Sequence, residues 1–242
     1  MSLLITMYVP EGIVLSGDSR LTVNWSEKNN KGQEINYSVN GSDNYNKIFN
    51  IQNKFGLGSF GTADIKGIPV SGFINEFIEE KIQENTEINE IPPKLHEFFG
   101  QKYNYPDVNF YLSGYKTENG ISIPYVYFIS IGNKSDSRIN INGGNITFGA
   151  NWGGEIEILQ RLIQDVKIKT GNEWHEAKAA PILYNFITLQ DAIDFCEYGI
   201  KTTIETLRFQ KRAKTVGGAI DTLIIRPKEG AEWIRKKELK SN

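Results

Sequence analysis

The chain has 242 residues, of which 39% are hydrophobic and 23% charged, with a formal net charge of −2 and a pI of about 5.8. These values are typical of one soluble globular domain spanning residues 1–242, and they offer no general attraction to nucleic acid or to an anionic membrane. The single cysteine, Cys196, excludes an intrachain disulfide and favours a reducing, cytoplasmic location. Because the two histidines and this cysteine lie far apart in sequence, we expect no metal site and no cofactor.

The chain opens with β-forming residues. Residues 3–9 and 13–15 are almost continuously apolar, and Pro10-Glu11-Gly12 between them is turn chemistry, so we predict a buried β-hairpin. The first apolar run is too short for a membrane span and has no basic residues ahead of it, which argues against a signal peptide.

The next hundred residues mix hairpins and helices. Residues 24–46 are polar and read as a loop or as short strands, whereas 47–51 and 55–60 predict a second hairpin. Apolar residues between 65 and 82 recur at helical spacing, and Pro92-Pro93 is suited to the first turn of a second helix.

The second half repeats this order. Residues 108–111, 124–131 and 146–148 predict strands, 155–168 and 189–209 predict amphipathic helices, and 220–225 predicts a late strand before a charged tail. Hairpins with helices grouped between them favour an α+β chain in which helix layers cover two antiparallel sheets, that is, a four-layer αββα sandwich.

Three segments resemble the β-type subunits of proteasomes and their bacterial relatives of the Anbu type, which are Ntn-hydrolases (N-terminal-nucleophile hydrolases). The first runs to Gly-Asp-Ser-Arg at 17–20. The second comprises Lys-Ile-Phe-Asn-Ile at 47–51 and the glycine turn at 58–64. The third is the helix at 192–209 with Gly-Gly-Ala-Ile-Asp at 217–221 after it. The resemblance implies the αββα fold and assembly into homo-oligomeric rings or stacks.

The resemblance also implies a set of catalytic residues. Ser2 would be the nucleophile once Met1 is removed, because its hydroxyl attacks a carbonyl while its own α-amine takes the proton. Lys47 would favour deprotonation, Asp18 would pair with Lys47, and the N–H of Gly61 would stabilise the oxyanion.

Further positions follow from the same comparison. Leu21 and Ser59 would border the pocket for a substrate side chain, and Arg20 corresponds to a structural turn arginine. The chain departs from the family at two positions that support the nucleophile's amine, which fall near Trp152 and Ala213. The glycine turn at 61–64 is also one residue shorter than in most relatives.

Three functional hypotheses follow. The leading one is a proteasome-like peptidase subunit that cleaves peptides or unfolded protein and so takes part in protein catabolism. The second is a catalytically inactive, proteasome-like protein that acts by self-association. The third is an N-terminal amidohydrolase acting on a small amide.

Overall fold

A computed structural model describes residues 2–238, and its centre is a pair of five-stranded antiparallel sheets. The first sheet has the order β14-β1-β2-β17-β18. In that order its strands are Gly149–Gly154, Leu3–Val9, Gly12–Asp18, Ile220–Arg226 and Gly230–Arg235. The second sheet has the order β11-β10-β9-β6-β5. In that order its strands are Ser135–Arg138, Ile121–Ser130, Val108–Glu118, Phe55–Gly61 and Ile48–Ile51.

The opening hairpin is confirmed. Every residue of β1 and β2 is buried, as their continuous apolar character predicted, and Leu4 pairs with Gly17 across the hairpin. The second hairpin, β5 with β6, is confirmed as well, with Ile48 opposite Gly58.

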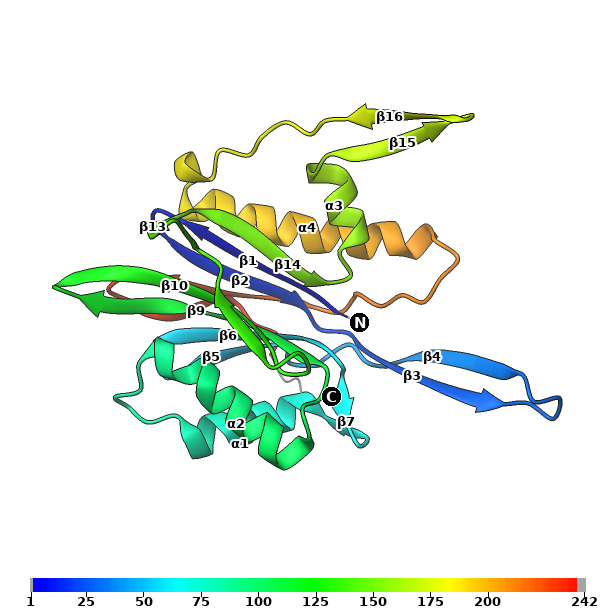
Figure 1. The fold of residues 1–242 in the computed structure, drawn as a ribbon, viewed down its shortest axis with the longest axis horizontal. Helices are drawn as coiled ribbons and strands as arrows, with labels where there is room; N and C mark the ends of the chain where they lie inside the picture. The colour runs from blue at the N-terminus through cyan, green and yellow to red at the C-terminus, as the bar shows by residue number, and fades with distance from the viewer. Residues whose placement is uncertain (1, 239–242) are drawn as a thin grey trace.

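Four α-helices occur in the described residues: α1 Val70–Lys81, α2 Ile91–Tyr103, α3 Glu157–Ile163 and α4 Leu189–Phe209. In Figure 1, α1 and α2 lie below the two large sheets, whereas α3 and α4 lie above them. Apolar residues of α1 and α2 form one core cluster with the second sheet, and those of α3 and α4 form another with the first sheet. None of these helices is long and apolar enough to cross a membrane.

The two large sheets contact each other directly. A third core cluster joins Leu4, Leu15 and Leu223 of the first sheet to Ile48 and Val126 of the second. Because these side chains are at most 4% exposed, the inner faces of both sheets are removed from water, and this burial is the main force holding them together.

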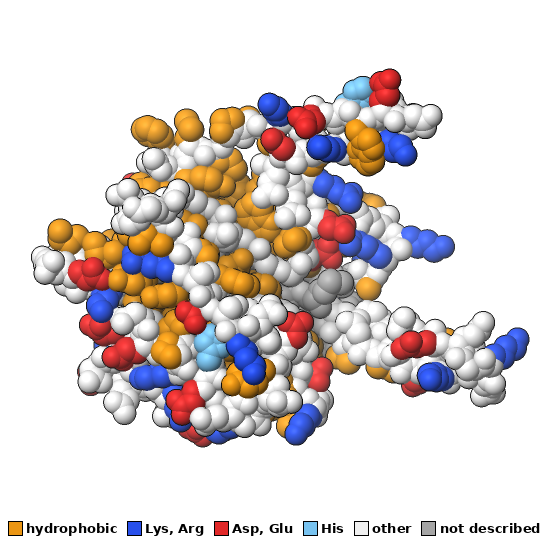
Figure 2. Space-filling view, in the orientation of Figure 1, with side chains coloured by type: hydrophobic (Ala, Val, Ile, Leu, Met, Phe, Trp, Pro, Cys, Tyr) orange, Lys and Arg blue, Asp and Glu red, His pale blue; other side chains and the backbone are white. Residues whose placement is uncertain are grey.

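Four further sheets have two strands each within the described residues. The largest is β3 Leu21–Lys28 with β4 Glu34–Ser42, and the next is β15 Val166–Thr170 with β16 Glu173–Ala177. Two short ribbons complete the set: β7 Asp64–Ile65 with β8 Ile68–Pro69, and β12 Ile141–Asn142 with β13 Asn145–Ile146. Figures 1 and 2 show the β3–β4 and β15–β16 hairpins projecting from the body.

The predicted fold class, a four-layer αββα sandwich made of two antiparallel sheets, is therefore corrected. Strand accounts for 44% of the structure and helix for 25%, and the described residues form six sheets instead of two. The protein consists mainly of antiparallel β-sheets, and two of its hairpins, β3–β4 and β15–β16, project from the body. Polar segments supply most of the additional strands: 24–46, for which the sequence left a loop or short strands open, contributes to β3 and β4, and β15 begins within the segment expected to be helical.

Four of the predicted elements change. Of the strand expected at 146–148, only Ile146 lies in a strand, at the end of β13. The segment 24–46 is one long hairpin, β3–β4, in which Trp25 stacks on Tyr37 with ring centroids 5.2 Å apart. The helix expected over 155–168 is confined to α3, and its last residues belong to β15. The helix expected from residue 65 begins at Val70, directly after Pro69, because a β-turn ribbon occupies 64–69.

Candidate functional site

A buried ion pair lies where the first two strands meet the second sheet. Asp18 ends β2 and Lys47 precedes β5, and their side chains are 0% and 2% exposed. Lys47 Nζ donates a hydrogen bond of 2.6 Å to Asp18 Oδ1. Burial is the largest influence on Lys47 and lowers its pKa, and the attraction of Asp18 opposes that shift without cancelling it.

The Asp18 carboxylate also binds the backbone around it. Its Oδ1 accepts from Leu3 N at 2.9 Å, so the first strand and the lysine share one oxygen atom. Its Oδ2 accepts from Arg20 N at 3.1 Å and from Gly217 N at 3.0 Å. A carboxylate offers about four lone-pair directions, and four donors meet this one, which fixes its orientation.

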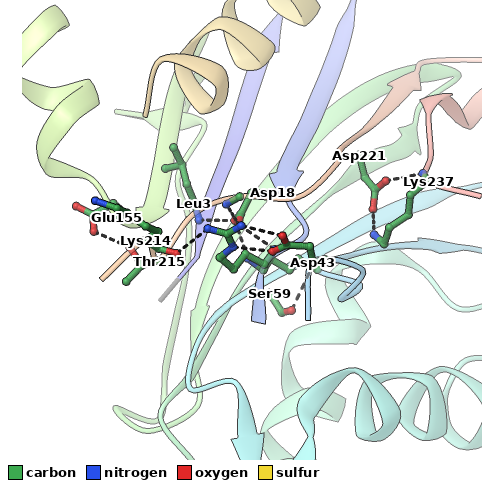
Figure 3. Close-up of polar contacts among 12 residues, drawn as sticks. Leu3, Asp18, Asp43, Ser59, Glu155, Lys214, Thr215, Asp221 and Lys237 are labelled. Atoms are coloured by element: carbon green, nitrogen blue, oxygen red, sulfur yellow. Dashed lines mark hydrogen bonds and ion pairs between the residues drawn. The ribbon is translucent and has the colours of Figure 1, made fainter. Parts of the chain in front are cut away.

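Two further positive charges act on the pair, and Figure 3 labels one of them, Lys237, beside Asp221. Lys237, held by the buried carboxylate of Asp221, and Arg20 both lower the pKa of Lys47 further through charge repulsion. Arg20 itself forms a two-pronged ion pair with Asp43, at 2.6 and 2.8 Å, and its NH1 donates to Lys214 O. The structural role that the resemblance implied for Arg20 agrees with these contacts, which join the base of the β3–β4 hairpin to the chain after α4.

Ser2 is fixed by the end of β14. It is 9% exposed, and its carbonyl oxygen accepts a hydrogen bond of 2.7 Å from Glu155 N. Gly154 packs so closely that a Cβ atom there would lie 1.7 Å from Ser2 O and 3.4 Å from Ser2 N. Gly154 also has a φ of +97°, so a larger residue would be strained as well as blocked. The removal of Met1 concerns a residue outside the described part of the chain.

Gly61 ends β6 and has a φ of +105°. A Cβ atom at this position would lie 2.6 Å from Asp107 O, so the close approach of two backbones requires glycine here. The preceding residue, Phe60, packs its ring on Gly153 of β14, which places the end of β6 beside the strand that holds Ser2. These contacts explain the glycine structurally, and its role as an oxyanion donor stays a prediction.

Ser59 and Leu21 differ in their surroundings. Ser59 N donates to Lys47 O at 2.8 Å and the Ser59 side chain is buried, so this residue fixes the backbone of Lys47. Leu21 begins β3, pairs with Ser42 and is partly exposed. The hollow formed by Lys54, Glu84 and neighbouring residues is not lined by either of them.

The structure thus joins Asp18, Lys47 and Ser59 by direct contacts and brings the start of β1 to the same carboxylate. The two positions at which the sequence differs from the proteasome-like pattern, Trp152 and Ala213, take no part in these contacts. Trp152 packs against the core cluster between the first sheet and α4, and Ala213 is exposed.

One buried carboxylate near Ser2 has no sign in the local sequence. Glu155 is 4% exposed, and it accepts hydrogen bonds from Thr215 Oγ1 at 3.1 Å and from Arg212 NH2 at 3.1 Å. In the sequence Glu155 stands at the head of an amphipathic run and looks like a solvated helix residue. Thr215 shows no site pattern either, since the resemblance concerns Gly-Gly-Ala-Ile-Asp at 217–221, and no local pattern connects residues 60 positions apart.

Groups of three or more His, Cys, Asp or Glu side chains that could hold a metal ion are absent from residues 2–238. Cys196 belongs to α4 and is fully buried in the core cluster between α4 and the first sheet. Burial raises the pKa of its thiol, which makes it a poor nucleophile. No family model and no curated protein sequence matches this chain.

Proposed function

We propose that the chain is a proteasome-like N-terminal-nucleophile peptidase that acts in the cytoplasm on peptides or unfolded protein. The observation that supports this most is the shared oxygen of Asp18, which accepts from Leu3 N and from Lys47 Nζ at once. A buried ammonium group is therefore held beside the first residues of β1. Such a pair is costly to bury, and a catalytic role gives a reason for its position.

The proposed reaction uses one residue twice. With Ser2 at the N-terminus, its hydroxyl oxygen attacks the peptide carbonyl and its hydroxyl proton passes to its own α-amine. An α-amine has a pKa of about 8 and is a usable base at neutral pH. The carbonyl carbon then bonds to Ser2, the leaving amine takes the proton, and water later releases the acyl group.

Lys47 and Gly61 have supporting roles in this proposal. The positive charge of Lys47 favours loss of the hydroxyl proton, and the low dielectric around the buried pair strengthens that effect. The N–H of Gly61 would stabilise the oxygen that becomes negative during attack. Serine serves in place of threonine because the hydroxyl is retained.

The test compares turnover of fluorogenic peptides by the unsubstituted protein, Ser2→Ala and Lys47→Ala. The mass of the intact protein first establishes whether Ser2 carries the free amine. We expect both substitutions to lower kcat by at least about a hundredfold, because each removes a group acting in the attack. Ser38→Ala, on the exposed strand β4, is the matched control and should retain full activity. Absent turnover, or turnover that both substitutions leave unchanged, would refute the peptidase proposal.

A second candidate, self-association without catalysis, is favoured by the β3–β4 hairpin. All but one residue of β4 are exposed, and so are the large apolar side chains of Trp25, Tyr37 and Val39. An isolated two-stranded hairpin is marginal in water, and this one extends away from the body of the protein. Packing against another copy, in a ring or stack, would cover these side chains.

A further inference from the structure

Glu155 is a buried carboxylate for which the proposed reaction has no use. Its side chain is 4% exposed, and Arg212 reaches it with two nitrogens, at 3.1 and 3.4 Å. Thr215 Oγ1 donates to Glu155 Oε2 at 3.1 Å. Burying a carboxylate costs several kcal/mol unless such partners compensate, so an apolar residue would serve better if filling space were the only requirement.

The backbone of the same residue holds Ser2. Glu155 N donates to Ser2 O at 2.7 Å, and Gly154 lies in van der Waals proximity to the backbone of Ser2. Gly154 is the last residue of β14 and pairs with Leu3, so the Glu155 N–H bond to Ser2 O is the last backbone contact at this end of the pairing. The side chain of Glu155 anchors this residue.

The segment that holds the Glu155 side chain also contacts Asp18. Thr215 lies two residues before Gly217, whose N–H donates to Asp18 Oδ2 at 3.0 Å and whose carbonyl accepts from Ser19 N at 3.0 Å. The chain after α4 therefore contacts Glu155 at one end and Asp18 at the other (Figure 3). Ser2 is held between them, by its carbonyl from one side and through Leu3 N from the other.

We propose that Glu155 is a positioning residue for Ser2. Its carboxylate, fixed by Arg212 and Thr215, keeps the 154–155 peptide against the Ser2 carbonyl and thereby sets where the Ser2 hydroxyl stands relative to Lys47. This inference rests on the proposed function for its purpose, but the physical link from Glu155 to Ser2 is testable without any substrate.

The first experiment measures amide hydrogen exchange by NMR in Glu155→Gln and Thr215→Val. We expect the amides at positions 3 and 155 to exchange at least about tenfold faster in both variants, since Glu155→Gln removes the charge that Arg212 pairs with and Thr215→Val removes a hydrogen-bond donor to the carboxylate. The amide of Leu223, in the middle of β17, should keep its exchange rate. The matched control is Glu157→Gln. Glu157 is two residues away and 61% exposed, and within residues 2–238 it forms an ion pair with Arg161 only. Unchanged exchange at positions 3 and 155 in both variants would overturn the inference, and Thr215→Val decides it if Glu155→Gln does not fold.

The second experiment uses peptide turnover. We expect Glu155→Gln to lower kcat at least about tenfold while KM changes less than about twofold, because the substrate-binding surface is left intact. Faster exchange with an unchanged kcat would show that Glu155 holds Ser2 without serving the reaction, which overturns the positioning role. If the unsubstituted protein itself lacks turnover, the proposed function fails, and the exchange data still decide whether Glu155 holds Ser2.

Discussion

The Asp18 carboxylate has four donors around it, three backbone N–H groups and the ammonium of Lys47. The backbone donors would remain if the negative charge were removed, but the ammonium would then be buried without a counter-ion. The residue therefore acts as a structural centre as well as a partner in the proposed chemistry, and the two roles have different mutational signatures.

Asp18→Asn is expected to lower the free energy of unfolding by about 3–5 kcal/mol, because it leaves the buried Lys47 charge uncompensated. Urea denaturation followed by fluorescence measures the change. The double variant Asp18→Asn with Lys47→Met should regain part of the loss, since it removes the orphaned charge too. A loss below about 1 kcal/mol in the single variant would contradict the burial of the pair.

Gly154 and Gly171 provide a matched comparison of two glycines with positive φ. A Cβ at Gly154 would meet Ser2 O at 1.7 Å, whereas nothing lies within 4 Å of one at Gly171. We expect Gly171→Ala to cost about 1–2 kcal/mol from backbone strain alone, and Gly154→Ala to cost about 3 kcal/mol or more because the clash is added. Equal losses in thermal or chemical denaturation would show that Ser2 is not held where the structure has it.

At the scale of elements, α4 illustrates a local signal that holds in the folded chain. Thr188 precedes the helix, its Oγ1 accepts from Asp191 N, and the Asp191 side chain accepts from Thr188 N. The structure shows this capping box, and the buried stripe of Ala192, Cys196, Ile200 and Leu207 follows at the helical spacing that the sequence predicts.

Thr188→Ala is expected to destabilise the protein by about 1 kcal/mol, because it leaves helix N–H groups without their acceptor. Thr202→Ala, inside the same helix and partly exposed, should instead be neutral or stabilising by up to about 0.7 kcal/mol through helix propensity. Calorimetric or urea unfolding of the two variants measures this. The same loss in both would mean that the cap does not stabilise α4.

For the whole molecule, the projecting β3–β4 hairpin leads to a prediction about assembly. Multi-angle light scattering should give a mass that is a multiple of the 27.4 kDa chain. Trp25→Ser combined with Val39→Ser should shift the population toward the monomer, because both side chains are exposed on the hairpin and apolar contacts drive association.

Ile121→Ser is the control for that experiment, since Ile121 is 63% exposed but begins β10, on a different part of the surface. It should leave the oligomer unchanged. A monomer for the unsubstituted protein across the micromolar range would refute self-association through this hairpin.

Local sequence patterns were sufficient where periodicity and caps agree. The hairpin β1–β2, the hairpin β5–β6, α2, α4 and β17 all follow from continuous or periodic apolar residues bounded by turn or capping chemistry. The pairing of Lys47 with Asp18 was also predicted, although on the strength of a resemblance. The strands β14, β16 and β18 were not predicted, β15 was placed partly in a helix, and for β3 and β4 a loop and short strands were both left open, because polar or glycine-rich segments carry little periodicity of their own.

The amino-acid sequence by itself determined the strongly apolar strands and the long amphipathic helix, because these depend on side chains close together in the chain. The candidate residues around Ser2 came from a resemblance and stay a prediction. Tertiary structure decided that six sheets form, that two hairpins project and that Glu155 meets Thr215 beside Ser2. These outcomes depend on contacts between residues far apart in sequence, and the free energy of such contacts is set by how the folded surfaces meet and not by any local pattern.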